Sequence, residues 1–356
     1  MNSVCVVGNG QLGRMLRLAG EPLGINVYPI GLDENSDTVS YQQSVITAEI
    51  ECWPKTARAR ELANHPNFIN RDSFAVITDR QSQKKLIDKL RLPTAQWVAL
   101  SEETNWSDLF FQLGETLIIK RRTGGYDGRG QFRVTAQNSC SLPHDMYDSC
   151  IIEACIPFDA EVSLIGARNR QGDCIFYPLT HNYHEQGILK VSMVELAKVS
   201  CLQGKAETML KAIMEELNYI GVMAMECFVV NGNLLINELA PRVHNSGHWT
   251  QNGASVSQFE LHLRAILDLP LIKPCIAAIS VMINLIGLPI NYAWLNSPLI
   301  HLHWYDKTVR DNRKVGHLNL VHSDRLLLLE NLKSISSLLP DSYQKSMDWV
   351  CNRLQD

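Results

Sequence analysis

The stretch VMAMECFVVNGNLLINELA, residues 222–240, contains two apolar runs separated by Asn231-Gly232-Asn233. Each run has the length of a strand, and the segment between them has the composition of a turn. The stretch therefore predicts an antiparallel β-hairpin. Each run contains a single acidic residue, Glu226 in the first and Glu238 in the second.

The length of the turn decides which residue faces Glu226. A three-residue loop places Glu226 opposite Glu238, whereas a two-residue loop places it opposite Asn237. Facing carboxylates repel each other, and a bound divalent cation removes that repulsion. Because Mg²⁺ prefers carboxylate oxygens together with substrate phosphates, the hairpin predicts a magnesium site at Glu226 and Glu238, with Asn237 as a third oxygen ligand. The alternative is a pair of solvated glutamates on the outer face of the sheet.

The segment that follows the hairpin, APRVHNSGH at residues 240–248, is polar and lies next to the predicted metal site. Arg242 is a candidate for bidentate binding of a phosphoryl group or a carboxylate. His244 is a candidate for hydrogen bonding to an oxyanion or for moving a proton. A lone histidine is more often structural, so the functional interpretation depends on the position of this segment beside Glu238.

A second glycine cluster, KRRTGGYDGRGQ at residues 120–131, lies between predicted strands at 117–120 and 131–135. The chain contains no GxxxxGK[ST] motif, so this cluster is not a Walker loop. A glycine-rich hairpin can fold over the phosphates of a nucleotide with its backbone amides facing them. Lys120 would then supply a point charge to those phosphates. The alternative is a flexible basic hairpin at the surface.

The N-terminal motif GNGQLG, residues 8–13, lies between a predicted strand at 3–7 and a predicted helix at 11–20, and a strand at 26–30 follows. This is a βαβ opening, and the amides at the start of its helix can bind an anion. Asp33 lies about 20 residues further on, where an acidic residue can meet a ribose hydroxyl. The motif is compatible with a dinucleotide site, with another anionic ligand, or with a tight turn that binds nothing.

Three further segments carry weaker signals. The extended backbone of residues 153–156 can hydrogen-bond the edge of an adenine, and Glu161 can accept hydrogen bonds from ribose hydroxyls. The basic loop at 307–314 can hold a phosphate monoester or can be a solvated turn. Residues 49–51, with two glutamates, fit either a functional or a structural role.

The rest of the chain predicts a mixed succession of helices and strands. A junction is expected at 70–80, and a capping box at Ser257 and Glu260 starts a helix. The other expected elements are helices at 79–90, 205–217, 257–267 and from 323 onward, and strands at 151–153, 161–166, 279–286, 301–305 and 316–320.

Composition excludes several classes of protein. The chain has 356 residues, of which 46% are hydrophobic and 20% charged, as in ordinary globular proteins, and its net charge of −4 gives no basic excess for nucleic acid or a membrane surface. No signal peptide is expected, and the most apolar stretch, at 276–290, is too interrupted to span a membrane. The ten cysteines show no CxxC pair and no zinc-ligand spacing, so we interpret them as thiols in a reducing compartment and expect a cytoplasmic protein.

Three of these motifs together resemble one family. GNGQLGRM (8–15), RRTGGYDGRGQ (121–131) and NELAPRVHNSGH (237–248) occur in the order found in ATP-grasp carboxylate–amine ligases. They are similar, more narrowly, to the 5-(carboxyamino)imidazole ribonucleotide synthases of purine biosynthesis, and the resemblance spans nearly the whole chain.

The resemblance implies an α/β fold with an ATP-grasp domain, an N-terminal Rossmann-like (pre-ATP-grasp) domain and a small β-rich C-terminal domain. We expect the first domain at 1–80, the ATP-grasp domain at 81–270 and the C-terminal domain at 271–356. The implied reaction is the ATP- and bicarbonate-dependent carboxylation of the exocyclic amine of 5-aminoimidazole ribonucleotide, through carboxyphosphate. A homodimer, and hand-off of the product to the mutase that follows, are also implied.

The resemblance also assigns residues to substrates, and in this family the first glycine turn receives the ribonucleotide and not a dinucleotide. Mg²⁺ would be held by Glu226 and Glu238. The residues around ATP would be Arg80, Lys120, Gly125, Tyr126, Asp127, Gly128, Arg129, Gly130, Gln131, Glu153, Ala154, Cys155, Ile156, Glu161, His184, Asn237 and Glu238. The ribonucleotide would contact Gln11, Leu12, Glu49, Tyr126, Arg129, Asn245, Lys307, Arg313 and Lys314. The catalytic candidates are Lys120, Arg242, His244 and Asp127.

One departure from the family pattern lies in the basic loop. Close relatives are expected to have Pro-Gly between Arg310 and Arg313, where this chain has Asp311-Asn312. Asn and Asp also serve in turns, so the loop can keep its shape, although Asp311 adds negative charge beside the expected phosphate site.

Three other functions remain open from the sequence. A formate-dependent glycinamide ribonucleotide transformylase would share the ATP-grasp fold. A nicotinamide-dependent dehydrogenase would use the first glycine turn but leaves the second glycine cluster and the glutamate pair unexplained. A nucleotide-binding regulator would bind ATP without turnover.

Overall fold

The computed structural model describes residues 3–32, 43–125, 128–139, 142–195, 200–276 and 278–355. The N-terminal part is the predicted βαβ unit, with a parallel three-stranded sheet in the order β2-β1-β3. Strand β1 pairs with β2 on one side and with β3 on the other. The elements of this part are β1 (Ser3–Val7), α1 (Gln11–Gly20), the 3₁₀ turn Glu21–Leu23, β2 (Asn26–Ile30), β3 (Val45–Ala48), α2 (Ala57–Asn64) and α3 (Arg71–Thr78).

Helix α3 occupies most of the segment for which the sequence predicted a junction, and no helix was predicted there. Its short sequence, RDSFAVIT, contains β-branched residues and no strong cap, and only Ser73 and Ile77 are buried. Helix α4 (Arg80–Lys89) follows at once, and the side chain of Asp79 caps it by accepting a hydrogen bond from the Ser82 amide. The start predicted for this second helix is therefore confirmed.

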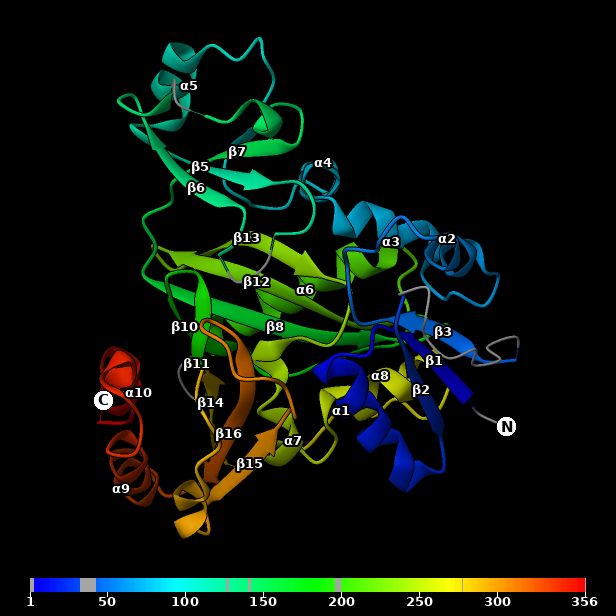
Figure 1. Ribbon diagram of the computed structural model, residues 1–356, viewed down its shortest axis with the longest axis vertical. Coiled ribbons are helices and arrows are strands. Elements are labelled where there is room, and N and C mark those ends of the chain that lie inside the picture. The colour runs from blue at the N-terminus through cyan, green and yellow to red at the C-terminus, as the bar shows by residue number, and fades with distance from the viewer. Residues whose placement is uncertain are drawn as a thin grey trace.

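A separate antiparallel sheet in the order β4-β7-β5-β6 carries the second glycine cluster. With α5 it forms the lobe at the top of Figure 1. Its own small core contains apolar side chains such as Leu117, Ile119 and Ile152. The elements are β4 (Trp97–Ala99), α5 (Trp106–Leu113), β5 (Thr116–Arg121), β6 (Gln131–Thr135), the 3₁₀ turn His144–Met146 and β7 (Cys150–Ala154).

The described residues also form a nine-stranded sheet, in the order β13-β12-β8-β10-β11-β14-β16-β15, with β9 paired to β8. The sheet passes without a break from the hairpin at 221–240 into the strands of the C-terminal part. Its elements are β8 (Ala160–Arg168), β9 (Cys174–Phe176), β10 (Thr180–Glu185), β11 (Ile188–Val194), β12 (Gly221–Val230), β13 (Asn233–Ala240), β14 (Ile279–Ile286), β15 (Ile300–Trp304) and β16 (Lys314–His322).

Helices cover this sheet, and the C-terminal pair lies along its β11–β16 part (Figure 1). Helix α8 begins as the capping box predicted, because the Ser257 hydroxyl accepts a hydrogen bond from the Glu260 amide at 3.2 Å. The remaining elements are α6 (Ser200–Glu216), the 3₁₀ turn Asn245–Gly247, α7 (Thr250–Gly253), α8 (Gln258–Ile266), the 3₁₀ turns Tyr292–Asn296 and Asp341–Tyr343, α9 (Arg325–Ser336) and α10 (Gln344–Gln355).

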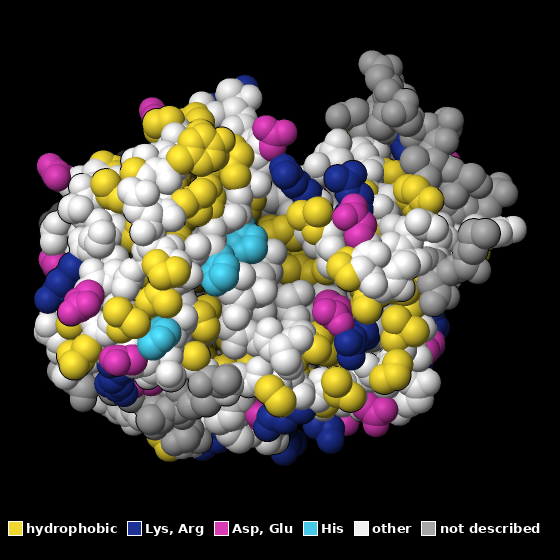
Figure 2. Space-filling model, turned by 90° about the horizontal axis from the view of Figure 1, so that it is seen from below, with side chains coloured by type: hydrophobic (Ala, Val, Ile, Leu, Met, Phe, Trp, Pro, Cys, Tyr) yellow, Lys and Arg dark blue, Asp and Glu magenta, His cyan; other side chains and the backbone are white. Residues whose placement is uncertain are grey.

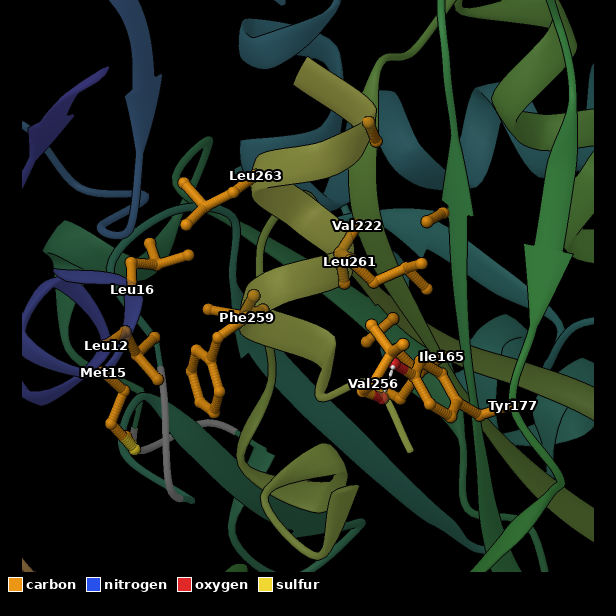
Figure 3. Packing of buried hydrophobic residues seen from close by; sticks show 14 of the residues in the cluster. Leu12, Met15, Leu16, Ile165, Tyr177, Val222, Val256, Phe259, Leu261 and Leu263 are labelled. Carbon is orange, nitrogen blue, oxygen red and sulfur yellow. Dashed lines mark hydrogen bonds between the residues drawn. The ribbon is translucent and has the colours of Figure 1, made fainter. Parts of the chain in front are cut away.

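One apolar cluster joins the N-terminal unit to the large sheet. Leu12 and Leu16 of α1 face Phe259 and Leu263 of α8 (Figure 3). The opposite side of α8 packs on the sheet at Val222. Each of these side chains is buried, so the cluster fixes the N-terminal glycine turn relative to the hairpin that carries the two glutamates.

The domain boundaries at 80 and 270 stay a prediction. Within the described ranges, every helix is too short or too polar to span a bilayer. The cysteines of the described residues are all free thiols.

Candidate active site

The hairpin β12–β13 places Glu226 directly opposite Glu238, as predicted, but by a different route. The turn has two residues, Asn231 and Gly232, both with positive φ (48° and 72°), which is the type I′ pattern. Up to Cys227 the register is that of a two-residue turn, and a β-bulge then shifts it by one residue. Of the two loop lengths considered, the two-residue turn is therefore the one observed, and the bulge brings the two carboxylates face to face.

The two carboxylates differ in their surroundings. Burial, followed by repulsion from Glu238, raises the pKa of Glu226 to about 7. Burial alone would also raise the pKa of Glu238, but its ion pair with the Arg80 guanidinium lowers it to about 2. The negative charge of Glu238 is thus balanced by Arg80, whereas the negative charge of Glu226 is poorly balanced.

These residues fit a divalent cation that also binds a phosphate-bearing substrate. Glu226 and Glu238 supply carboxylate oxygens from adjacent strands, and the side chain of Glu226 is only 15% exposed. Among the described residues no group of three or more His, Cys, Asp or Glu side chains surrounds one point. Mg²⁺ matches this donor set, because it is held by one or two carboxylates and completes its shell with water and substrate phosphates.

Two buried lysines share one carboxylate beside this pair. Lys84 Nζ lies 2.9 Å from Glu153 Oε1, and Lys120 Nζ lies 2.7 Å from Glu153 Oε2. Lys120 also donates to Asn237 Oδ1 at 2.8 Å, which connects the small sheet to the metal-site hairpin. Burial, which is the largest effect, lowers the pKa of Lys84. Glu153 thus affects the site only by pairing with the two lysines, because its carboxylate is buried and each of its oxygens contacts one of them.

The second glycine cluster forms a loop that touches both sheets. Gly124, Gly128 and Gly130 have positive φ (75°, 74° and 72°). Arg80 donates to the Gly125 carbonyl at 3.3 Å. A Cβ on Gly128 would lie 2.8 Å from the Gln186 carbonyl in the turn between β10 and β11, so the loop needs glycine there for two reasons.

Four further residues of this loop are predicted to contact the substrates. Tyr126 and Asp127 lie outside the described residues. Arg129 and Gln131 are exposed, and Gln131 begins β6.

The predicted nucleotide wall is formed by β7 and the residues that follow it. The Ala154 amide donates to the Gln96 carbonyl at 3.0 Å, and the Cys155 amide donates to the Thr116 carbonyl at 3.3 Å. These two amides are therefore engaged within the protein. Ile156 is half-buried just beyond them.

Glu161 and His184 form a pair beside Glu226. His184 Nδ1 contacts a carboxylate oxygen of Glu161. Although burial alone would lower the pKa of His184, the hydrogen bond to Glu161 and the charge of Glu226 raise it above its ordinary value. A shallow concavity is lined by Glu161, Val162, Asn182, His184, Glu226, Cys227, Phe228 and Asn237. The face seen from below in Figure 2 is also hollowed, and histidine side chains line part of that hollow.

Arg242 and His244 lie at the other side of the glutamate pair. His244 Nε2 is 3.5 Å from Glu226 Oε1. Burial, and next the positive charge of Arg242, lower the pKa of His244 to about 3. Arg242 pairs with Glu51 at 2.7 Å. His244 is therefore close to the proposed metal, whereas Arg242 acts on His244 through its charge and is held by Glu51.

The first glycine turn already contains a carboxylate. Glu49 is buried and accepts hydrogen bonds from the amides of Gly10 and Gly13, the second at 2.9 Å. A Cβ on Gly8 would clash with the same side chain. Those two amides are therefore not available to a pyrophosphate, which argues against a dinucleotide site.

The predicted ribonucleotide residues at this turn come together from distant parts of the chain. Lys307 donates to the Gln11 side chain. The charges of Arg242 and Lys307 both act on Glu49. The Leu12 side chain is buried in the interface with α8, so only its backbone faces the turn.

Three other predicted ribonucleotide residues lie in the 3₁₀ turn after the hairpin (Asn245), in the basic loop (Arg313) and at the start of β16 (Lys314). Asn245 and Asn284 exchange side-chain hydrogen bonds at 3.0 and 2.5 Å. Arg313 donates to the Thr308 carbonyl at 3.3 Å. Lys314 begins β16 and acts electrostatically on Glu226 and on both histidines of the site.

The basic loop keeps its turn although Asp311-Asn312 stands where Pro-Gly was expected. Asn312 has φ +58°, the conformation that favours glycine, and the Arg313 amide donates to the Arg310 carbonyl at 3.1 Å. Asn tolerates this region better than most residues, so it replaces the expected glycine.

Sequence reasoning did not select Lys84, Asn284 or the partner of Arg242. Lys84 lies in a charged helical segment, QSQKK, where a solvated lysine is the usual case. Its spacing with apolar Ile87, on the same face of the helix, was the available signal. No signal in the sequence pairs Glu51 with Arg242, because the two residues are far apart along the chain.

Comparison with known proteins places this arrangement in a family. Residues 85–259 match the family of ATP-grasp domains, and residues 280–331 match the phosphoribosylaminoimidazole carboxylase C-terminal domain. The N5-carboxyaminoimidazole ribonucleotide synthase of Escherichia coli is 61% identical over 350 residues, covering 98% of this chain and 99% of the relative. The chain belongs to the N5-carboxyaminoimidazole ribonucleotide synthase family. It is an ATP-grasp ligase, and the predicted fold and family are confirmed.

Solved structures of other N5-carboxyaminoimidazole ribonucleotide synthases have the same fold. The enzyme of Thermus thermophilus superposes with a TM-score of 0.84 at 36% identity, covering 95% of this chain and 99% of that one. The enzyme of Aspergillus clavatus, in complex with ADP and 5-aminoimidazole ribonucleotide, superposes with a TM-score of 0.81 at 26% identity, covering 94% and 98%.

Proposed function

We propose that this chain uses ATP and bicarbonate to carboxylate the exocyclic amine of 5-aminoimidazole ribonucleotide. The observation that carries the proposal is the facing pair Glu226 and Glu238. Arg80 pairs with Glu238, and His244, on which the charge of Arg242 acts, lies 3.5 Å from Glu226. Such an arrangement suits transfer of a phosphoryl group to a small acid, because the cationic groups around the pair stabilise the negative charge that develops.

Glu226 and Glu238 would hold Mg²⁺, which when bound neutralises charge on the nucleotide phosphates. The fit is supported by the poor compensation of Glu226, whose charge repels that of Glu238 in the absence of a cation.

The proposed reaction has three bond-changing steps. A bicarbonate oxygen bonds to the γ-phosphorus of ATP while the bond to the β–γ bridging oxygen breaks, which gives carboxyphosphate and ADP. The carbon–oxygen bond to the phosphoryl group then breaks and releases carbon dioxide beside inorganic phosphate. The exocyclic amine bonds to that carbon and gives up one proton to the phosphate.

The chain's own residues bind and orient these reactants. Lys120 and Arg80, which pair with Glu153 and Glu238, would lie on the nucleotide side and balance phosphate charge. Arg242 would bind the bicarbonate or the carboxyphosphate, after exchange of its contact with Glu51. His244 would contact the transferring phosphoryl group.

The glycine loop would exclude water. Its contact with the β10–β11 turn at Gly128 supports a covering position over the hairpin. Carboxyphosphate hydrolyses in water, so a closed loop protects the intermediate. On this loop, Tyr126 and Arg129 would also contact the ribonucleotide, and Asp127 would be a further catalytic candidate.

At the other end, Gln11, Glu49 and Lys307 would bind the ribonucleotide, with Asn245, Arg313 and Lys314 on its far side. The support is the convergence of Gln11, Glu49 and Lys307 on one turn, and the fact that the Aspergillus clavatus relative binds this ribonucleotide.

The test is phosphate release from Mg-ATP and bicarbonate, with and without 5-aminoimidazole ribonucleotide. We expect strong stimulation by the ribonucleotide in the wild type, loss of that stimulation in Glu238→Gln, and no loss in the matched control Glu330→Gln, which alters an exposed residue of α9. Stimulation by formate and glycinamide ribonucleotide instead would favour the transformylase reaction. ATP binding without turnover under any condition would favour a regulator.

We further propose a cytoplasmic homodimer that passes its product to the mutase that follows. The free thiols of the described residues support a reducing location. The support for dimerisation and for product hand-off is the family resemblance. Analytical sedimentation of the purified chain, which measures its mass in solution, tests dimerisation.

A further inference from the structure

A line of buried polar side chains leads to His244 from across the large sheet. Ser246 Oγ lies 2.9 Å from His244 Nδ1, and Ser163 Oγ lies 2.8 Å from Ser246 Oγ. Asn182 Nδ2 lies 2.9 Å from Ser163 Oγ, and Ser192 Oγ lies 2.8 Å from Asn182 Oδ1. The line crosses β11, β10 and β8 and ends in the segment after the hairpin.

Burial of these four polar side chains costs free energy of desolvation. Ser163, Ser192 and Ser246 are completely buried, and Asn182 is 5% exposed. They stabilise no helix end or turn apart from Ser246, which lies in the 3₁₀ turn that His244 caps. Buried hydroxyl and amide groups carry a desolvation cost unless every donor has an acceptor, so this line must be hydrogen-bonded in a consistent direction.

A backbone group fixes that direction. The Ser246 amide donates to His244 Nδ1 at 3.3 Å. An amide N–H cannot accept a hydrogen bond, so Nδ1 must present a lone pair. The Ser246 hydroxyl, which faces the same nitrogen, must therefore donate to it as well.

The directions of the other hydrogen bonds follow because each hydroxyl has only one proton to donate. Because Ser246 donates to His244, its oxygen accepts from the Ser163 hydroxyl. The oxygen of Ser163 in turn accepts from the Asn182 amide group, and Asn182 Oδ1 accepts from Ser192. In every hydrogen bond of the line, the acceptor is therefore the group nearer to the imidazole.

We infer that Ser192, Asn182, Ser163 and Ser246 are positioning residues that hold His244 as an Nε2–H donor. The proton then lies on the nitrogen that is 3.5 Å from Glu226 Oε1. The ring is held at its backbone too, because the Gln258 side chain bonds both the amide and the carbonyl of His244, at 2.9 and 2.7 Å.

The inference rests on the proposed function for its chemical meaning. An Nε2–H donor can hydrogen-bond a phosphoryl or carboxylate oxygen, but it has no lone pair with which to remove a proton from the amine. His244 therefore acts as a hydrogen-bond donor and not as a general base, and the proton of the amine leaves with the phosphate.

The tautomer can be measured without any substrate. In protein labelled with ¹⁵N-histidine, long-range ¹H–¹⁵N spectra distinguish protonated from unprotonated ring nitrogens, and the signals absent from His244→Ala identify the residue. We expect His244 to show an unprotonated Nδ1 and a protonated Nε2. A protonated Nδ1 in the wild type would overturn the inference, whatever the enzyme's activity.

An isosteric variant tests whether the line causes this state. Asn182→Asp replaces the amide donor by a carboxylate, so the Ser163 hydroxyl must donate to that carboxylate. The Ser246 hydroxyl then has no donor in the line, which favours acceptance from a proton on His244 Nδ1, and only the Ser246 amide still opposes that proton. We expect the Nδ1 signal of His244 to move toward its protonated position. The matched control is Ser346→Ala, which removes a completely buried hydroxyl that donates only to the Tyr343 carbonyl in the C-terminal part. A shift in Asn182→Asp no larger than in Ser346→Ala would overturn the causal claim.

A kinetic measurement separates positioning from folding. We expect Ser246→Ala to lower kcat about tenfold, the scale seen when a group that orients a functional histidine is lost, with KM for ATP and for the ribonucleotide unchanged. Ser346→Ala should keep the wild-type kcat. An unchanged kcat in Ser246→Ala would contradict the positioning role, whereas failure of the wild type to turn over would contradict the proposed function and leave the tautomer measurement valid.

Discussion

Replacing Glu153 by Gln tests the charge arrangement beneath the nucleotide side of the site. Glu153 is 3% exposed and is the shared counter-ion of Lys84 and Lys120, at 2.9 and 2.7 Å. Glutamine has nearly the same shape but no charge. The variant therefore leaves two buried ammonium groups with one neutral partner.

The magnitudes follow from the number of charges left without a partner. Removing one member of a buried ion pair costs about 3–5 kcal/mol, so we expect that loss of unfolding free energy in Glu153→Gln. Lys84→Met should cost only about 1–3 kcal/mol, because Glu153 keeps Lys120 as a partner. The double variant should be more stable than Glu153→Gln alone, because it removes one of the two uncompensated cations.

The assay is equilibrium unfolding in urea, followed by circular dichroism near neutral pH. Glu216→Gln is the matched control, because Glu216 forms an exposed pair with Lys89 at 2.6 Å and should cost about 0–1 kcal/mol. A Glu153→Gln variant no less stable than Lys84→Met, or a double variant less stable than both single ones, would refute the shared counter-ion.

Three further predictions follow from single side chains and turns. Burial lowers the pKa of His262 to about 4, whereas its pKa in the unfolded chain is about 6.5, so on acidification the unfolded chain binds the extra proton first. The contribution of His262 to the free energy of unfolding is therefore complete above pH 6.5 and should fall by roughly 3 kcal/mol as the pH drops to 4. His262→Gln should largely remove this loss in acid-unfolding curves. Gly128→Ala should raise the KM for ATP at least about tenfold, since it strains a φ of +74° and presses a Cβ against the Gln186 carbonyl; unchanged steady-state kinetics would exclude the loop contact. Asn312→Gly should keep or slightly raise stability, whereas Asn312→Ala should lose about 1 kcal/mol at its φ of +58°, and equal thermal midpoints for the two variants would contradict this.

Much of the fold could be predicted because apolar periodicity and turn residues agree along most of the chain. The βαβ opening, the hairpin at 221–240 and the helix capped by Ser257 were all visible as local patterns. Helix α3 was not, because its sequence has weak helix propensity and few apolar positions. There, packing against the rest of the protein decides the structure.

The glutamate pair shows the limit of local reasoning. The sequence predicted that Glu226 faces Glu238 if the loop has three residues and faces Asn237 if it has two. The turn Asn231-Gly232 is the preferred two-residue hairpin, and the β-bulge supplies the missing shift. A bulge leaves no clear mark in a single sequence, because its extra residue has an ordinary side chain.

Contacts between distant segments could not be predicted from the local patterns, and only the family resemblance grouped Gln11, Glu49 and Lys307 at one site. Glu49 fills the anion site of α1, and it lies 36 residues from Gly13, whose amide it accepts from. The sequence pattern of that turn is the same with or without an internal carboxylate. Only the three-dimensional structure distinguishes a turn that is open to an anion from one that already holds a side chain.

The most direct test of the central claim follows the oxygen of bicarbonate. With ¹⁸O-bicarbonate, Mg-ATP and 5-aminoimidazole ribonucleotide, attack of bicarbonate on the γ-phosphorus places one labelled oxygen in the released phosphate. We predict labelled phosphate in amounts that match carboxylated product in the wild type, and neither in Glu238→Gln. Carboxylated product accompanied by unlabelled phosphate would contradict a carboxyphosphate intermediate in this enzyme.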